Sequence, residues 1–236
     1  MIVIAINKAK KILLICLGLL IFGGGVMFYR EELMQTSAKV QNYCIVVDAG
    51  HGKPDGGAVS KSGVEEEALN LAIALKLRNK LEQLGYEVIM TRETNDNIAS
   101  LEEQSSLREM KTADLTKRVQ IANESKADFM ISIHMNEYTN STPWGWQTFY
   151  SKDSEEGKTL AILVQKTISK YIDRPNKRTA LPIEGIKIVD KTILPVIIVE
   201  CGFLSNAEDL QLLQTEEYQA KLVDGMVEAI ENYYDT

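Results

Sequence analysis

The chain alternates short apolar segments with amphipathic ones, and few folds accommodate that pattern. Four apolar runs have the length of strands, at residues 44–48, 86–91, 128–133 and 195–199. Between or after them, apolar residues recur at helical spacing in residues 69–84, 115–125, 158–171 and 218–230. Continuous apolar strands separated by helices are typical of an α/β domain. We therefore predict a mostly parallel sheet with helices on both faces.

Several local features refine this prediction. Residues 95–112 are polar and are expected to form a long loop, whereas residues 146–150 are a candidate for an added strand. In the predicted helix at residues 158–171, Ile162 and Ile168 are candidates for the buried face. Gly85 is expected to end the helix that precedes it.

The N-terminal region differs from the rest of the chain. Residues 12–28 form an uncharged apolar run that follows three lysines. Such a run lies at the lower end of the length that spans a bilayer, and preceding lysines favour a cytoplasmic N-terminus. We expect residues 1–30 to be an uncleaved signal-anchor or transmembrane segment, with cleavage and secretion as the alternative. Residues 31–42 would be a linker, and residues 43–236 a single extracytoplasmic domain.

Charge and cysteine content exclude some classes of protein. The net charge is -7, and because residues 1–40 carry five basic and two acidic side chains, the remainder is more acidic still. An acidic domain is poorly suited to bind nucleic acid. Cys44 and Cys201 are expected to lie at opposite ends of parallel strands and therefore to remain unbonded.

Three polar residues are placed at the ends of predicted strands. His51 and His134, the chain's two histidines, follow the first and third strands, and Glu200 follows the fourth. Sites in α/β sheets form at the carboxyl edge of the strands. Two histidines and a carboxylate are a ligand set of catalytic zinc. Taken singly, each residue has a simpler interpretation as a turn or a solvated strand end.

The acidic run at residues 65–67 begins a predicted helix, which is favourable for the helix dipole alone. Helical periodicity distinguishes its members. The inward stripe is predicted to contain Leu69, Ile73, Leu77, Leu81 and Leu84. At ~100° per residue Glu66 falls on this stripe, while Glu65 and Glu67 fall about 100° to either side. An inward Glu66 requires a cation, because an unpaired buried carboxylate is costly.

Two tryptophans on a polar stretch have two interpretations. Trp144 and Trp146 could line a groove that stacks against sugar or peptide, or they could pack against the rim of the sheet. The sequence leaves both open.

Four segments in order, residues 48–57, 63–70, 132–136 and 199–206, resemble the zinc-dependent N-acetylmuramoyl-L-alanine amidases of the amidase 3 family. The resemblance covers residues 43–234, and within the family it is strongest to the germination-specific amidases of endospore formers. It implies one Zn²⁺ per chain, with His51, Glu66 and His134 as ligands and Glu200 as the general base.

The resemblance also implies a substrate and partners. The substrate would be peptidoglycan, cut at the amide between muramic acid and L-alanine during maturation of the spore cortex. A muramic-acid deacetylase would act downstream to give muramic lactam, and an exported accessory protein is a possible partner for targeting. The chain departs from the family pattern at Ala49, Glu67 and Cys201, where proline, lysine and threonine are common.

Two rival functions remain open at this point. A zinc carboxypeptidase would use the same metal chemistry on stem peptides and needs an arginine for the terminal carboxylate, which Arg92 or Arg118 could supply. A non-catalytic wall-binding regulator should lack at least one of the four site residues, and all four are present.

Overall fold

The computed structural model describes residues 43–99 and 106–235, which belong to one compact unit. The predicted membrane segment and linker, residues 1–42, lie outside this range. Among the helices described, none combines the length and hydropathy that a bilayer crossing requires. The strands are β1 (Cys44–Ala49), β2 (Glu87–Met90), β3 (Phe129–Asn136), β4 (Gln147–Ser151), β5 (Leu181–Ile183) and β6 (Val196–Phe203). The helices are α2 (Glu66–Gln83), α3 (Leu107–Glu124), α4 (Glu155–Tyr171), α5 (Lys187–Lys191), α6 (Ala207–Leu213) and α7 (Glu216–Tyr234).

The strands form one six-stranded sheet in the order β2-β1-β3-β6-β4-β5. The sheet is parallel across strands β2, β1, β3 and β6, as predicted. Strand β4, the predicted added strand, runs antiparallel to β6, and β5 runs parallel to β4. The sheet is therefore mixed, with a reversed pair at one edge that strand patterning alone does not reveal.

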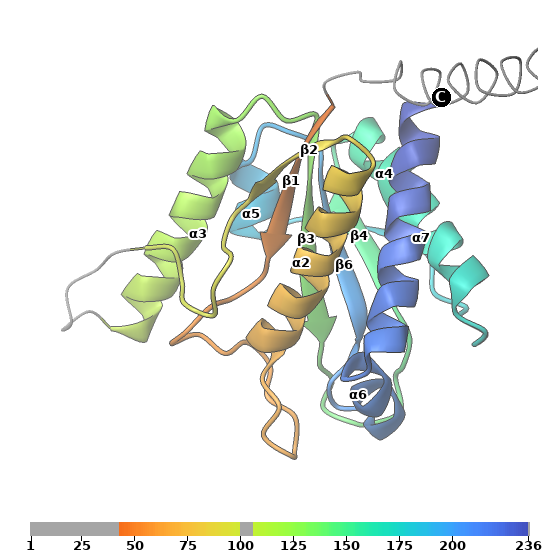
Figure 1. Ribbon diagram of the computed structural model, residues 1–236. Coiled ribbons are helices and arrows are strands. Elements are labelled where there is room, and N and C mark those ends of the chain that lie inside the picture. The colour runs from red at the N-terminus through yellow and green to blue at the C-terminus, as the bar shows by residue number, and fades with distance from the viewer. Residues whose placement is uncertain (1–42, 100–105, 236) are drawn as a thin grey trace, which may run out of the picture. The chain divides into compact units, whose positions relative to one another are not determined.

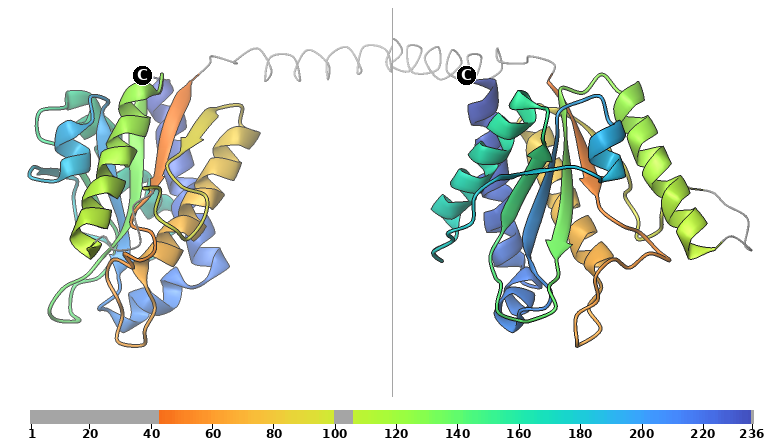
Figure 2. Two further views of the ribbon diagram at one scale, coloured as in Figure 1. Left: turned by 90° about the vertical axis from the view of Figure 1, so that its left-hand side faces the viewer. Right: turned by 180° about the vertical axis from the view of Figure 1, so that it is seen from behind.

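Helices cover both faces of the sheet, as predicted (Figures 1 and 2). Helices α2, α4 and α7 pack on one face, and α3 and α5 on the other. Alternate residues of β1 show the division, because Ile45 lies in the larger core with Ile73, whereas Val46 packs with Ala122 and Ile188. A strand buried on both faces explains why β1 reads as a continuous apolar run.

Three predictions about the helices were wrong. Helix α3 begins at Leu107 rather than residue 115, because Ser106 and Glu109 form a capping box that starts it within the predicted loop. Ile162 is 49% exposed, since it lies two positions from Leu160 and so on the opposite side of α4. Leu84 is also 49% exposed, because α2 ends before it.

Cys44 and Cys201 are free thiols, as predicted. Cys44 begins β1 and Cys201 lies near the end of β6, and both are buried without a disulfide. Each strand runs parallel to β3, so the two thiols are at opposite ends of the sheet.

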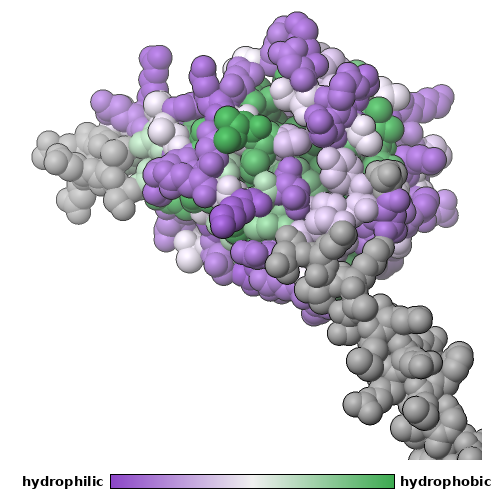
Figure 3. Space-filling view, turned by 90° about the horizontal axis from the view of Figure 1, so that it is seen from above, coloured by the Kyte–Doolittle hydropathy of each residue, from purple (hydrophilic) through white to green (hydrophobic). Residues whose placement is uncertain are grey.

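An aromatic stack brings together the two ends of the described chain. The rings of Tyr43 and Tyr234 are 3.6 Å apart between centroids, and Tyr86 lies 5.7 Å from Tyr234. The stack lies where β1 begins, at the amino-terminal edge of the parallel strands. Figure 3 looks onto the molecule from this side, where apolar residues appear only in patches between hydrophilic ones.

Candidate metal centre

The polar residues singled out in the sequence meet at the carboxyl edge of the parallel strands. His51 follows β1, Glu66 is the first residue of α2, and His134 and Glu200 are register partners on β3 and β6. Both strands run further than predicted, so His134 and Glu200 lie within strands rather than after them. Their side chains are thus positioned by the sheet itself.

Three of these side chains form a cluster of donor atoms. One ligand atom each from His51, Glu66 and His134 lies within 4.8 Å of the others. Glu66 bridges the rings, with Oε1 2.9 Å from His134 Nδ1 and Oε2 3.3 Å from His51 Nε2. Two imidazoles and one carboxylate facing a common centre are the ligand set of a catalytic zinc site.

The backbone around the cluster leaves no room for larger residues. A Cβ at Gly50 would lie 2.3 Å from the His134 ring, and one at Gly57 would lie 2.5 Å from Glu66 Oε2. Gly57 also has φ 70°, which L side chains rarely adopt. His51 itself has φ 62°, in the left-handed region where residues other than glycine are uncommon. A strained residue that carries a candidate ligand is typical of a functional site.

The Glu66 carboxylate is held in place from several directions. The residue is 3% exposed, which confirms the inward orientation predicted from helical periodicity. Oε1 accepts hydrogen bonds from Asn70 Nδ2 at 3.1 Å and the Met135 amide at 3.0 Å. Oε2 accepts from the Ala58 amide at 2.9 Å. These donors fix both oxygens in direction, so the carboxylate is preorganised toward the histidines.

The electrostatics of the cluster favour a positive charge at its centre. Burial alone would raise the pKa of Glu66, but hydrogen bonds to His134 and His51 hold that pKa far below its usual value. Burial alone would lower the pKa of His51, but hydrogen bonds to Asp55 and Glu66 raise it to about 9. Without a metal, a proton on His51 supplies the compensating charge. A divalent cation would meet the same need, so the residues present fit zinc.

Glu200 lies beside the cluster, and its carboxylate is less well satisfied by hydrogen bonds than that of Glu66. Its Oε2 atom is buried and has no hydrogen-bond partner. Burial, reinforced by the charge of Glu66, raises the pKa of Glu200 to about 7, although His134 and His51 lower it. A carboxyl group with a pKa near neutrality is suited to accept and return a proton.

Two arginines hold the loop that carries His51. Arg118 is 1% exposed, and its guanidinium binds the Asp48 and Asp114 carboxylates and the carbonyl oxygens of residues 49 and 51. Arg92 is 3% exposed and donates to the carbonyl oxygens of residues 49 and 50. Both guanidinium groups are therefore committed to the backbone of this loop. Neither is available as the carboxylate-binding arginine of a carboxypeptidase.

The other members of the acidic run do not join the cluster. Glu65 precedes α2 and pairs with Lys53. Glu67, which falls about 100° from the inward stripe on the helical wheel, is nevertheless only 2% exposed. Its carboxylate oxygens lie 3.9 Å from Arg92 and from Lys53, because the loop after β1 covers the first turn of α2. The helical wheel could not anticipate that covering loop.

Of the two tryptophans, Trp146 packs inside the protein and does not line a groove. It is fully buried, and its Nε1 donates to the Gln165 carbonyl oxygen at 3.3 Å. Trp144 is partly exposed, with the Arg174 guanidinium 4.1 Å from the ring centroid.

A cavity of about 340 Å³ adjoins the cluster. His51, His134 and Glu200 are part of its lining. The lining also has an apolar part, which consists of Met110, Leu115, Ile183, Ile186, Ile188 and Ile198. The apolar part of the lining could not be predicted from the sequence, because its residues come from α3, β5, α5, the residue before α5, and β6, and they meet only in the folded chain.

Asp55 was also missed by sequence reasoning, although it lies within one of the segments that carry the family resemblance. Its Oδ2 lies 2.9 Å from His51 Nδ1. A carboxylate four residues after a candidate ligand, in the same loop, was the available signal.

Comparison with known proteins identifies the family of the chain. A family model described as N-acetylmuramoyl-L-alanine amidase matches residues 45–232. The chain belongs to this family. The assignment made from four short sequence segments is thus confirmed, as is the enzyme class, a hydrolase of amide bonds.

Individual amidases of the family match over most of their length. The chain is 33% identical over 190 residues to the germination-specific N-acetylmuramoyl-L-alanine amidase of Bacillus subtilis strain 168, covering 80% of this chain and 79% of that protein. The solved structure of the CwlD amidase from Clostridioides difficile in complex with the GerS lipoprotein matches with a TM-score of 0.80 and 36% identity, covering 82% of this chain and 99% of that chain. The catalytic domain of CwlV from Bacillus (Paenibacillus) polymyxa var. colistinus matches with a TM-score of 0.68 and 30% identity, covering 82% and 98%.

Proposed function

We propose that this chain is a zinc-dependent amidase that hydrolyses the bond between muramic acid and L-alanine in peptidoglycan. The observation that carries the proposal is the cluster of His51, Glu66 and His134, with the unpaired Oε2 of Glu200 beside it. The family assignment supplies the substrate class. Residues 43–236 would form the catalytic domain.

In this proposal His51, Glu66 and His134 hold one zinc ion per chain. Bound zinc would polarise the amide carbonyl and lower the pKa of a water molecule to about 7. Glu200 takes the proton of the attacking water at its unpaired Oε2 and returns it to the departing alanine nitrogen. Arg92 and Arg118 act on the protein rather than the substrate, by holding the loop that presents His51.

We also propose a physiological role for this activity. The relatives include a germination-specific amidase, which supports a role in spore cortex maturation, with a muramic-acid deacetylase acting on the product. The complex of a related amidase with a lipoprotein supports an exported accessory partner for this chain. Such a role places the domain outside the cytoplasmic membrane, with residues 1–30 as the anchor.

Product analysis tests the proposal. Zinc-loaded protein is incubated with purified peptidoglycan, and the fragments are analysed by mass spectrometry. The expected products are free peptides that begin with L-alanine and glycan strands bearing unsubstituted muramic acid. Release of D-alanine with intact glycan–peptide linkages would instead establish a carboxypeptidase. His134→Ala is the matched control, because it removes one donor of the cluster and should yield neither product.

A further inference from the structure

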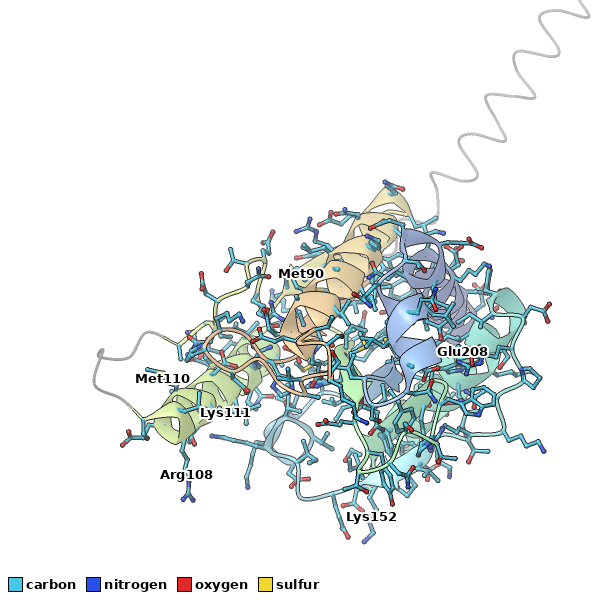
Figure 4. The ribbon with its side chains drawn as sticks, turned by 90° about the horizontal axis from the view of Figure 1, so that it is seen from below. Met90, Arg108, Met110, Lys111, Lys152 and Glu208 are labelled. Atoms are coloured by element: carbon cyan, nitrogen blue, oxygen red, sulfur yellow. The ribbon has the colours of Figure 1, made fainter. Side chains whose placement is uncertain are left out.

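A line of polar contacts extends from the metal cluster to helix α3. Asp55 Oδ2 lies 2.9 Å from His51 Nδ1. The second oxygen, Oδ1, accepts from the Gly57 amide at 3.1 Å and lies 2.7 Å from Lys111 Nζ. Lys111 belongs to α3, which is separated from the loop of Asp55 by more than 50 positions of the chain. Figure 4 looks onto this edge and labels Lys111 on α3.

The contacts determine how His51 is oriented. Its Nε2 faces the cluster, 3.3 Å from Glu66 Oε2, and its Nδ1 faces Asp55. A histidine that binds metal through Nε2 carries its remaining proton on Nδ1, and this proton needs an acceptor. Metal-binding histidines usually donate this proton to a carboxylate or carbonyl oxygen, which fixes the ring and makes the ligand more basic.

Resting on the proposed function, we propose that Asp55 is a positioning residue that orients His51 for zinc and that Lys111 links α3 to the affinity of the site. Asp55 divides its oxygens between the two tasks, since Oδ2 serves His51 while Oδ1 serves Lys111 and the Gly57 amide. A shift of α3 that carries Lys111 away changes the position of the carboxylate against which His51 is aligned.

A purely local role does not explain the arrangement. Capping of the Gly57 amide uses only Oδ1 and requires neither the contact with His51 nor the one with Lys111. The His51 ring contacts Glu66 Oε2 through Nε2 and Asp55 Oδ2 through Nδ1, so Asp55 is the contact that holds the Nδ1 side of the ring. Lys111 and Asp55 also line the cavity beside the cluster, so a ligand or partner that displaces α3 acts on the metal through this pair.

Zinc affinity, measured by competition with a chromophoric chelator, tests the proposal without reference to activity. Asp55→Ala removes the acceptor, and we expect zinc to bind about 10- to 100-fold more weakly. Asp55→Asn keeps an acceptor oxygen but no charge and should fall between Asp55→Ala and wild type. Lys111→Met should weaken binding several-fold, because this ion pair is partly exposed. The control is Lys117→Met, on the same helix, whose amine donates to Gln120 Oε1 and which should leave affinity unchanged.

A second readout separates positioning from general stability. In ¹⁵N-edited NMR of the zinc-loaded protein, the Nδ1 proton of His51 should resonate downfield in wild type and shift in Asp55→Asn. Unfolding of the metal-free variants reports any loss of stability independently. If wild type binds zinc in a Glu66-dependent manner but Asp55→Ala binds within twofold of it, this inference is wrong while the proposed function stands. If wild type binds no zinc, the proposed function itself fails.

Discussion

Replacement of Glu200 by glutamine should remove hydrolysis and at the same time stabilise the metal-free protein. Glutamine has nearly the same shape but cannot accept the proton of the attacking water. Loss of a general base reduces the rate by about 10²–10⁴-fold. The gain in stability has a separate origin, because Oε2 of Glu200 is buried without a partner and its ionisation in the folded state is unfavourable.

The magnitude of the stability gain follows from the pKa of Glu200. Burial raises the pKa from 4.5 to about 7. At about 1.4 kcal/mol for each pH unit, this difference corresponds to at most about 3–4 kcal/mol, and screening by solvent in the adjoining cavity reduces it. Because the pKa of Glu200 is raised in the folded state, the free energy of unfolding of the wild type falls as the pH rises. The neutral carboxyl contributes full stability below pH 4.5, and this contribution is lost as the pH rises through 7. The advantage of Glu200→Gln should therefore be absent near pH 4.5 and complete above pH 7.

Urea denaturation of the chelator-treated proteins between pH 4.5 and 8 measures this difference. For a domain of this size, 1 kcal/mol corresponds to about 2–4 °C in melting temperature, so thermal unfolding also detects it. Glu124→Gln, at an exposed carboxylate on α3, is the matched control and should follow wild type at every pH. A difference between Glu200→Gln and wild type that is the same at pH 5 and pH 8 would refute the reasoning. Added zinc should reduce the advantage, because a nearby cation stabilises the ionised carboxylate.

Three further outcomes are expected from the same cluster. Glu66→Ala should lose zinc, by elemental analysis, whereas Glu65→Ala should retain it; the opposite result would mean that the wrong glutamate has been assigned. Gly50→Ala should lower zinc affinity in the chelator assay, because its Cβ would lie 2.3 Å from the His134 ring; wild-type affinity would show that the ring can move aside. The value of kcat/KM should fall as the pH drops through the pKa of Glu200, which is about 7 before metal binds and lower with it; a rate that is flat down to pH 4 would exclude Glu200 as the base.

The convergence of the site residues was predictable from the sequence for a physical reason. Carboxyl ends of parallel strands meet at one edge, so His51, His134 and Glu200 could be brought together without knowledge of the strand order. Helical periodicity placed Glu66 on the inward face, and the structure agrees. These predictions depend only on local pattern and on one general property of parallel sheets.

Other features depend on contacts between distant segments and could not be predicted. The reversed direction of β4 and β5 leaves no trace in strand patterning. The burial of Glu67 depends on the loop after β1, and the commitment of Arg92 and Arg118 depends on carbonyl groups more than 40 positions away. When a side chain binds the backbone of a distant segment, residue type and spacing do not reveal which segment supplies the partner.

The stack of Tyr43 on Tyr234 has a consequence for how the domain can be rewired. The two ends of the described chain lie side by side, at the edge of the sheet opposite the histidines and glutamates of the candidate metal site. A short peptide could join the two ends, and new ends could then be opened in an exposed loop elsewhere, as in a circular permutant. Fusion at either end of the described domain likewise leaves the edge with the candidate metal site clear, so reporters or purification tags attached there should not obstruct access to the cell wall polymer.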